Sequence, residues 1–189
     1  MRKLKLQVQM TVDGYMAGPN GEMDWISFDW DDGLKEYVTE LTESMDCIVL
    51  GRNLAEGFIP HWAAVAQNPA HPEHSAGKIF SDTPKVVFST TLEQSKWDNT
   101  VLAKGNLVEE ITRLKQQQGK GIIAYGGREI VSSLISNGLV DEFNLFVNPV
   151  ALGKGMAIFQ GLEQTQPLVL ETARPFPCGI VLVRYRRAA

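Results

Sequence analysis

Three short runs of apolar residues constrain most strongly what this chain can fold into. They cover residues 47–50, 86–88 and 122–125, and none contains a charged side chain. Runs of this length without polar alternation are typical of strands buried on both faces, as in a parallel sheet covered by helices on both sides. Apolar residues at helical spacing follow the second and third runs, within residues 107–114 and 130–135. The sequence therefore predicts an α/β protein.

Both ends of the chain add strands of a different kind. Residues 4–12 alternate apolar with polar side chains, which is the period-two pattern of a strand. Residues 143–148, 168–172 and 180–185 are also predicted to be strands, with no helix between them, and the last two flank a turn rich in proline and glycine. We expect one mixed, mostly parallel central sheet with an antiparallel tail that ends in a hairpin. A single domain is expected to span residues 1–189.

Two further segments complete the expected organisation. Apolar residues from Leu34 to Met45 recur at helical spacing, and Asp31 or Asp32 is placed to cap that helix. Residues 61–78 contain two prolines and a glycine but no clear period. They are predicted to be a long functional or mobile loop.

The composition limits the classes of function. Of the 189 residues, 44% are hydrophobic and 21% are charged, and the formal net charge is -4. This composition is ordinary for a globular domain, and no block of Lys and Arg indicates nucleic-acid binding. No apolar run approaches the roughly 20 residues of a membrane span. The two cysteines, Cys47 and Cys178, form no spacing motif, so we expect a cytoplasmic protein without a disulfide framework.

The strongest local signal for a ligand is Gly126-Gly127-Arg128, between the run 122–125 and a predicted helix. Adjacent glycines let the backbone approach a ligand closely, and the free N–H groups at a helix start favour an anion such as pyrophosphate. A tight turn that needs glycine only for its dihedral angles explains the same residues equally well. If the turn binds a ligand, a bulky residue at Gly127 is expected to abolish binding without unfolding the chain.

Two other strand ends carry candidate phosphate ligands. Gly51 and Arg52 follow the run 47–50, and the Arg52 guanidinium can bind phosphate with two parallel hydrogen bonds. Ser89 and Thr90 follow the run 86–88 and offer hydroxyl donors. The alternatives are a solvated arginine and hydroxyls that cap the strand end. Because ligands collect at the carboxyl edge of open α/β sheets, the shared position of the three strand ends favours binding.

Aromatic residues cluster near the glycine-rich first loop. The three aromatic side chains are predicted either to stack on a flat heterocycle or to pack in the core; they are Trp25, Phe28 and Trp30.

The histidines of the predicted loop, His71 and His74, show no usual metal-ligand pattern, so no metal site is expected.

Four blocks of the sequence resemble, in order, the reductase domain of the bifunctional riboflavin-biosynthesis deaminase–reductase, and more weakly dihydrofolate reductase. The blocks are residues 11–18 with 21–26, residues 46–53, residues 124–127 with 140–142, and residues 149–155. The resemblance implies the three-layer α-β-α dihydrofolate reductase-like fold, a homodimer and bound NADPH. The implied reaction is hydride transfer to a C=N or C=O carbon of a small heterocyclic substrate that is pterin- or pyrimidine-like.

The resemblance also implies roles for individual residues. The phosphates and adenosine of NADPH are expected to contact Gly51, Arg52, Ser89, Thr90, Gly126, Gly127 and Arg128. Val12, Ala17 and Gly18 are expected beside the nicotinamide, and Asp13 and Trp25 are expected in the cleft as catalytic residues. Because Arg52 is present and no acidic residue stands at the end of the run 47–50, NADPH is expected to be preferred over NADH.

The chain departs from the family pattern in three ways. Asn53-Leu54 provides no hydroxyl after the arginine, and the acidic helix residue that binds pterin has no clear counterpart, although Asp29 and Asp31 are nearby. There is also no deaminase domain, so we expect a stand-alone relative. The sequence shows no obvious proton donor. A non-catalytic NADPH- or ligand-binding module on the same scaffold is therefore the alternative function.

Overall fold

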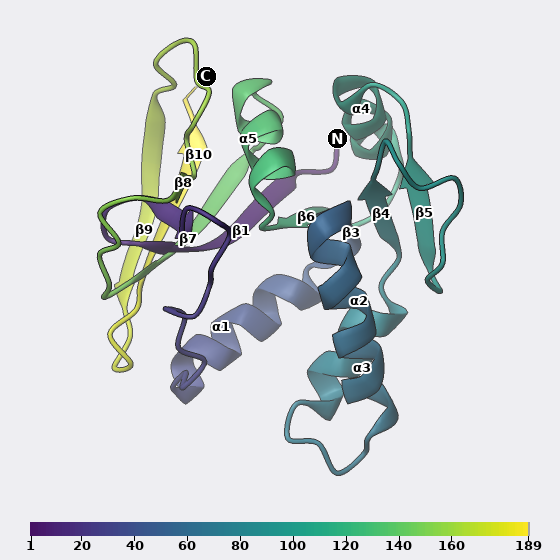
Figure 1. Ribbon diagram of the computed structural model, residues 1–189, viewed down its shortest axis with the longest axis horizontal. Coiled ribbons are helices and arrows are strands. Elements are labelled where there is room, and N and C mark those ends of the chain that lie inside the picture. The colour runs from purple at the N-terminus through teal and green to yellow at the C-terminus, as the bar shows by residue number, and fades with distance from the viewer. Residues whose placement is uncertain (189) are drawn as a thin grey trace.

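The computed structural model describes residues 1–188, which form a three-layer α-β-α arrangement (Figure 1). The elements in chain order are β1 (Leu4–Thr11), β2 (Tyr15–Ala17), α1 (Asp32–Glu43), β3 (Met45–Gly51), α2 (Arg52–Gln67), α3 (His74–Asp82), β4 (Lys85–Phe88), β5 (Thr100–Ala103), α4 (Leu107–Gln116), β6 (Gly121–Tyr125), α5 (Arg128–Ser136), β7 (Glu142–Asn148), β8 (Met156–Ala157), β9 (Leu168–Pro175) and β10 (Val181–Arg187). The three apolar runs are the centres of β3, β4 and β6, so the predicted buried strands are confirmed.

Within residues 1–188, the main sheet has eight strands in the order β5-β4-β3-β6-β1-β7-β10-β9. β1 pairs in parallel with β6 and β7, and β3, β4 and β5 continue the parallel part. β10 is antiparallel to both β7 and β9. The predicted mixed, mostly parallel sheet with a closing hairpin is confirmed. The three strands of the predicted tail, β7, β10 and β9, pair with one another in the antiparallel direction, and β7 joins them to the parallel part through its pairing with the central β1.

The helices cover the two faces of the sheet in separate groups. α4 and α5 pack with the even-numbered residues of β1 in one apolar cluster. α1, α2 and α3 pack on the opposite face with side chains of β3, β4 and β6, and α1 also packs with β7 and β10. The predicted cap of α1 is Asp31, whose carboxylate accepts a hydrogen bond from the backbone N–H of Leu34 at 3.0 Å. No helix in residues 1–188 is long and apolar enough to cross a bilayer.

The predicted loop over residues 61–78 is largely helical. α2 continues to Gln67, and α3 begins at His74, so the connection between them is short. The rings of Phe58 and Trp62 in α2 lie 6.1 Å apart edge to face, and Trp62 lies 4.5 Å from Phe80 in α3. This aromatic packing, and not a long loop, organises the segment. Met45 was also assigned wrongly, since it begins β3 and does not end α1.

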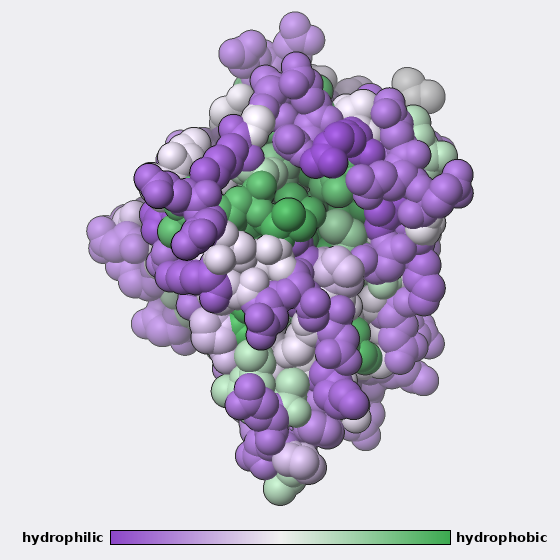
Figure 2. Space-filling view, turned by 90° about the vertical axis from the view of Figure 1, so that its right-hand side faces the viewer, coloured by the Kyte–Doolittle hydropathy of each residue, from purple (hydrophilic) through white to green (hydrophobic). Residues whose placement is uncertain are grey.

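The edge strand β5 was not predicted. It has four residues, and its Val101 is 64% exposed, so it lacks the buried apolar run that marks the other parallel strands. Figure 2 shows the side of the molecule that carries this edge, where the surface is mostly hydrophilic around an apolar area in its upper half.

Candidate active site

The parallel pairing places all three candidate phosphate motifs at one edge of the sheet. β4, β3 and β6 are neighbours, and their carboxyl ends lead directly into Ser89, Arg52 and Gly126. β1 lies next to β6 and leads into Val12, which is 60% exposed. Four strand ends therefore form one continuous border, which is the usual ligand-binding edge of an open α/β sheet.

The turn between β6 and α5 presents an open stretch of backbone. Gly127 is the N-cap of α5 and has φ +106°, a conformation that side-chain-bearing residues rarely adopt. A Cβ atom on Gly126 would meet nothing within 4 Å. The first N–H groups of α5, which begins at the exposed Arg128, have no partners within the helix. This turn can accept an anionic group that approaches the backbone closely.

Gly51, at the end of β3, serves packing. A Cβ atom there would lie 3.3 Å from Cγ2 of Ile130, a tight contact that would require Ile130 of α5 to shift slightly. Arg52 begins α2, and its Nη1 lies 3.0 Å from Oε1 of Glu56. Lys96 Nζ is 3.9 Å from the same oxygen. Sequence reasoning missed both neighbours of Arg52. The i,i+4 spacing of Arg52 and Glu56 was a usable signal, whereas nothing in the sequence relates Lys96 to Arg52.

At the end of β4, the structure favours a capping role for Ser89. Its hydroxyl is buried and accepts hydrogen bonds from the N–H groups of Thr91 at 3.2 Å and Leu92 at 3.0 Å. Thr90 is exposed beside it. The Ser89 side chain therefore holds the loop after β4, and Thr90 is the hydroxyl that remains open to a ligand.

Asp13 ties the first loop to a distant segment. Its carboxylate accepts hydrogen bonds from Thr11 Oγ1 at 2.6 Å, Gly153 N–H at 2.6 Å and Leu152 N–H at 3.0 Å. The hydrogen bond from Thr11, followed by that from Gly153, holds the pKa of Asp13 below its usual value. In this arrangement the Asp13 carboxylate joins the first loop to the segment at Leu152 and Gly153. The role that sequence reasoning assigned to it as a catalytic group stays a prediction.

Ala17 and Gly18 lie a few residues after Asp13 in the same segment. Both are buried, and Ala17 pairs with Met156 of β8. The N–H of Gly18 donates to the carbonyl oxygen of Glu22 at 2.8 Å. The Glu22 carboxylate lies beside the Gly18 Cα and would have to move if Gly18 carried a side chain.

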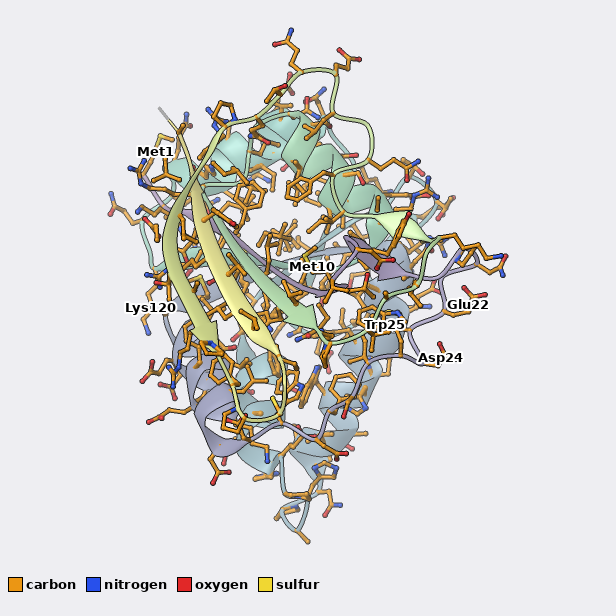
Figure 3. All side chains as sticks on the ribbon, turned by 90° about the vertical axis from the view of Figure 1, so that its left-hand side faces the viewer. Met1, Met10, Glu22, Asp24, Trp25 and Lys120 are labelled. Atoms are coloured by element: carbon orange, nitrogen blue, oxygen red, sulfur yellow. The ribbon has the colours of Figure 1, made fainter. Side chains whose placement is uncertain are left out.

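The aromatic cluster divides into an inner and an outer part. Trp25 and Trp30 line a small cavity of about 70 Å³ at the carboxyl end of β7, together with Asn148 and Cys178. Figure 3 shows Trp25 beside that strand end. The indole Nε1 of Trp25 is buried and has no hydrogen-bond partner in residues 1–188. Phe28 is 71% exposed, so it does not contribute to a wall in this conformation.

Sequence reasoning missed a row of polar side chains on the central strand β1. Gln7 is only 8% exposed, and its Oε1 has no hydrogen-bond partner among the described residues. Gln9 Oε1 accepts a hydrogen bond from Asn148 Nδ2 at 2.8 Å, while its own Nε2 is buried and unpartnered in residues 1–188. A usable signal was present, because strict alternation is unusual in a central parallel strand, which is normally apolar on both faces.

A larger hollow of about 440 Å³ lies on the α5 side of the sheet, between β1, β7, β9 and β10. Its walls are mostly apolar, formed by Met10, Leu145, Val147, Phe159, Gln166, Leu168, Val183 and Tyr185. It does not include the strand ends that carry the candidate cofactor residues. Within residues 1–188 no three His, Cys, Asp or Glu side chains gather as metal ligands.

Two solved structures illustrate the architectures that this chain resembles. A putative riboflavin biosynthesis protein from Shewanella sp. PV-4 matches with a TM-score of 0.72 and 22% identity over all of both chains. The diaminohydroxyphosphoribosylaminopyrimidine deaminase/5-amino-6-(5-phosphoribosylamino)uracil reductase of Thermotoga maritima matches with a TM-score of 0.70 and 20% identity, over 99% of this chain and 57% of that one. These similarities show that the chain has the same fold as these two proteins.

The sequence comparison identifies the family. The model of the RibD C-terminal domain matches residues 2–182, so the chain belongs to that family. The uncharacterized protein YyaP of Bacillus subtilis (strain 168) is 34% identical over 188 residues, covering 97% of this chain and 94% of YyaP. The riboflavin biosynthesis protein RibD of Corynebacterium ammoniagenes is 21% identical over 81% of this chain and 44% of its own length. The resemblance found in the sequence is confirmed.

Proposed function

We propose that this protein is an NADPH-dependent reductase that transfers a hydride to a C=N or C=O carbon of a pterin- or pyrimidine-like small molecule. The observation that carries the proposal is the turn at Gly126 and Gly127. It presents open backbone at the start of α5, in the middle of the sheet's carboxyl edge. Membership of a reductase family and the name of the Thermotoga maritima relative support the choice of reaction and substrate class.

The residues fit a dinucleotide laid along the carboxyl edge. The turn at Gly126 and Gly127 would hold the pyrophosphate, and Arg52 with Lys96 would hold the ribose phosphate on the side of β3 and β4. When bound, NADPH supplies the hydride. Val12 would lie next to the nicotinamide, at the end of β1. The hydrogen bonds that the Asp13 carboxylate accepts from Leu152 and Gly153 would hold the loop that borders this position.

The direct test is to mix the protein with NADPH, follow the cofactor's fluorescence, and then add a panel of pyrimidine and pterin heterocycles. The proposal expects saturable binding, followed by oxidation of NADPH with at least one heterocycle. Binding without turnover across the panel would favour the non-catalytic module, for which the hydrogen bonds that engage the Asp13 carboxylate with Thr11, Leu152 and Gly153 are the supporting observation. No binding of NADPH would contradict the reductase and would leave only a module that binds another ligand.

Replacing Trp25 with alanine is expected to reduce turnover more than cofactor affinity. The side chain lines the cavity at the end of β7, beyond the strand ends that carry the phosphate motifs. We expect kcat to fall about tenfold while the Kd of NADPH changes less than about twofold, which corresponds to loss of one aromatic contact with substrate. Phe28→Ala, at an exposed ring of the same segment, is the control. Unchanged turnover with weakened NADPH binding would assign Trp25 to the cofactor.

We also propose that the protein is a homodimer that covers the hollow on the α5 side. Val147 lines this hollow, whereas Phe146 is buried on the opposite face of β7, so the strand is apolar on both faces. Sedimentation is expected to give a dimer at micromolar concentration, and Val147→Asp is expected to give a folded monomer. Val101→Asp, at the exposed β5 edge, should leave the dimer intact. A monomeric parent protein would remove this proposal.

A further inference from the structure

Two segments that are far apart in the sequence form a small sheet of their own, outside the eight-stranded sheet. They are residues 12–17, which contain β2, and residues 150–158, which contain β8, and we call them the paired segments. β2 and β8 pair in the antiparallel direction (Figure 3). The N–H of Val12 also donates to the carbonyl oxygen of Val150 at 3.0 Å. Because backbone hydrogen bonds join the paired segments, a shift of one displaces the other.

Gly155 brings the backbones of the paired segments into direct contact. A Cβ atom at this position would overlap the carbonyl oxygen of Ala17 and lie 3.3 Å from Cδ1 of Tyr15. The carbonyl oxygen belongs to the backbone of β2, so it cannot turn away as the end of a flexible side chain could. A side chain at Gly155 would therefore force the two segments apart.

At the end nearest β1, a side chain joins the paired segments. Asp13 Oδ2 accepts hydrogen bonds from the N–H groups of Leu152 at 3.0 Å and Gly153 at 2.6 Å. Asp13 Oδ1 accepts from Thr11 Oγ1 at 2.6 Å. The carboxylate therefore bridges the last residue of β1 and the second of the paired segments.

Thr11 fixes the orientation of this carboxylate from inside the main sheet. Its side chain is fully buried, and its hydroxyl accepts a hydrogen bond from the N–H of Tyr15 at 3.0 Å. The single hydroxyl proton is then directed to Asp13. Thr11 stands in register with Asn148, the last residue of β7, so the paired segments leave the sheet from neighbouring strand ends.

Val12 lies at the centre of these connections, and it is 60% exposed at the end of β1. The hydrogen bond between Thr11 and Asp13 spans it on one side, and Val150 holds its backbone N–H on the other. The proposed function places the nicotinamide beside Val12. A displacement of about 1 Å in the groups that position a reacting ring can lower the rate about 100-fold. The paired segments can therefore influence the reaction without touching the substrate.

We propose that Asp13 is a positioning residue, which acts through Leu152 and Gly153 to hold the paired segments, and with them Val12, at the carboxyl end of β1. Thr11 supports this role by orienting the carboxylate. Residues 150–158 thereby become part of the reductase site, although they follow β7 and carry none of the phosphate motifs. The inference rests on the proposed function for the reaction, whereas the coupling of the paired segments does not depend on it.

Asp13→Asn separates positioning from proton transfer. The carboxamide oxygen still accepts from Leu152 and Gly153, and its nitrogen donates to Thr11 Oγ1 once the hydroxyl proton turns to the Tyr15 carbonyl oxygen, 3.3 Å away. A carboxamide cannot transfer a proton in place of a carboxylic acid. We expect Asp13→Asn to keep kcat within about threefold of the parent, and Asp13→Ala to lower kcat about tenfold. The Kd of NADPH should change less than about threefold in both variants.

Thr11 and Gly155 test the same connection from its two ends. Thr11→Val removes the hydroxyl and should reproduce the loss of kcat seen in Asp13→Ala, whereas Thr11→Ser should restore most of it. Because the two residues act through one hydrogen bond, the effects of Thr11→Val and Asp13→Ala should not add in the double variant. Gly155→Ala should also lower kcat, with Asp13 intact. Asp98→Ala, at an exposed site before β5, is the charge control.

Amide hydrogen exchange without NADPH measures the coupling itself. Exchange within residues 150–158 should be faster in Asp13→Ala, Thr11→Val and Gly155→Ala than in the parent, and should stay close to the parent rate in Asp13→Asn. Thermal melts show which variants are folded. Unchanged exchange in folded Asp13→Ala would overturn the inference.

Two further results decide between the possible failures. If Asp13→Asn loses as much kcat as Asp13→Ala while its exchange matches the parent, Asp13 transfers a proton and the positioning role is wrong. If the parent protein oxidises NADPH with no substrate, the reductase function fails and the effect on hydride transfer fails with it. The exchange experiment then still decides whether Asp13 couples the paired segments, so the two failures are distinguishable.

Discussion

Replacing Gly126 with valine should weaken NADPH binding by about 100-fold, the equivalent of losing two hydrogen bonds to a charged group. The space beside Gly126 is open, so the new side chain meets no protein atom within 4 Å of its Cβ. It would instead stand where a pyrophosphate must approach the backbone to reach the start of α5. The thermal unfolding temperature should therefore remain close to that of the parent. NADPH fluorescence titration and a thermal melt measure the two effects.

The structure revises the choice of variant that the sequence suggested. Gly127 has φ +106°, and a Cβ atom there would also contact Ile130 and Leu54 at 3.6 and 3.7 Å. Gly127→Val is therefore expected to be destabilised by backbone strain of roughly 1–3 kcal/mol, contrary to the prediction that it stays fully folded. Gly126→Ala serves as a graded control, with a smaller loss of affinity. Normal NADPH binding by Gly126→Val would place the pyrophosphate away from this turn.

The parts of the fold that sequence predicted well are those set by local pattern. The centres of β3, β4 and β6 are apolar runs, and α4 and α5 carry apolar residues at helical spacing, so each was found to within a few residues. Segment 61–78 was missed because its prolines interrupt the pattern, while its stability comes from contacts between Trp62 of α2 and Phe80 of α3. The direction of β7 depends on its pairing with β1, which no local pattern encodes.

In the candidate site too, features set by local sequence were predicted and features set by tertiary contacts were not. Gly51, Ser89 and Gly126 were placed together from sequence, because parallel strands that follow one another along a chain end at one edge. Their partners were not predictable, since contacts such as Asn148 with Gln9 join residues 139 positions apart. The alternation in β1 was interpreted only as a sign of a strand. That its polar face is buried could not be predicted without knowing that β1 is central and that this face lies under α1.

Arg52→Ala should lower the affinity for NADPH about tenfold and leave the affinity for NADH nearly unchanged. The two cofactors differ by the phosphate on the adenosine ribose, and a hydrogen bond to a charged group contributes roughly 1.5–3 kcal/mol. The prediction from sequence overlooked an acidic neighbour, because Glu56 pairs with Arg52 at 3.0 Å. An exposed i,i+4 pair of this kind contributes only about 0.3–0.5 kcal/mol, so a phosphate can displace it.

Two further variants sharpen this test. Glu56→Gln removes the competing carboxylate from both Arg52 and Lys96, so NADPH affinity should rise modestly while NADH affinity stays the same. Arg113→Ala, which breaks an exposed pair with Glu110 on α4, controls for the change in net charge and should affect neither cofactor. If Arg52→Ala weakens NADPH and NADH equally, Arg52 must contact a group common to both, most simply the pyrophosphate. In that case Lys96, held 3.9 Å from the same carboxylate, becomes the remaining candidate for phosphate discrimination.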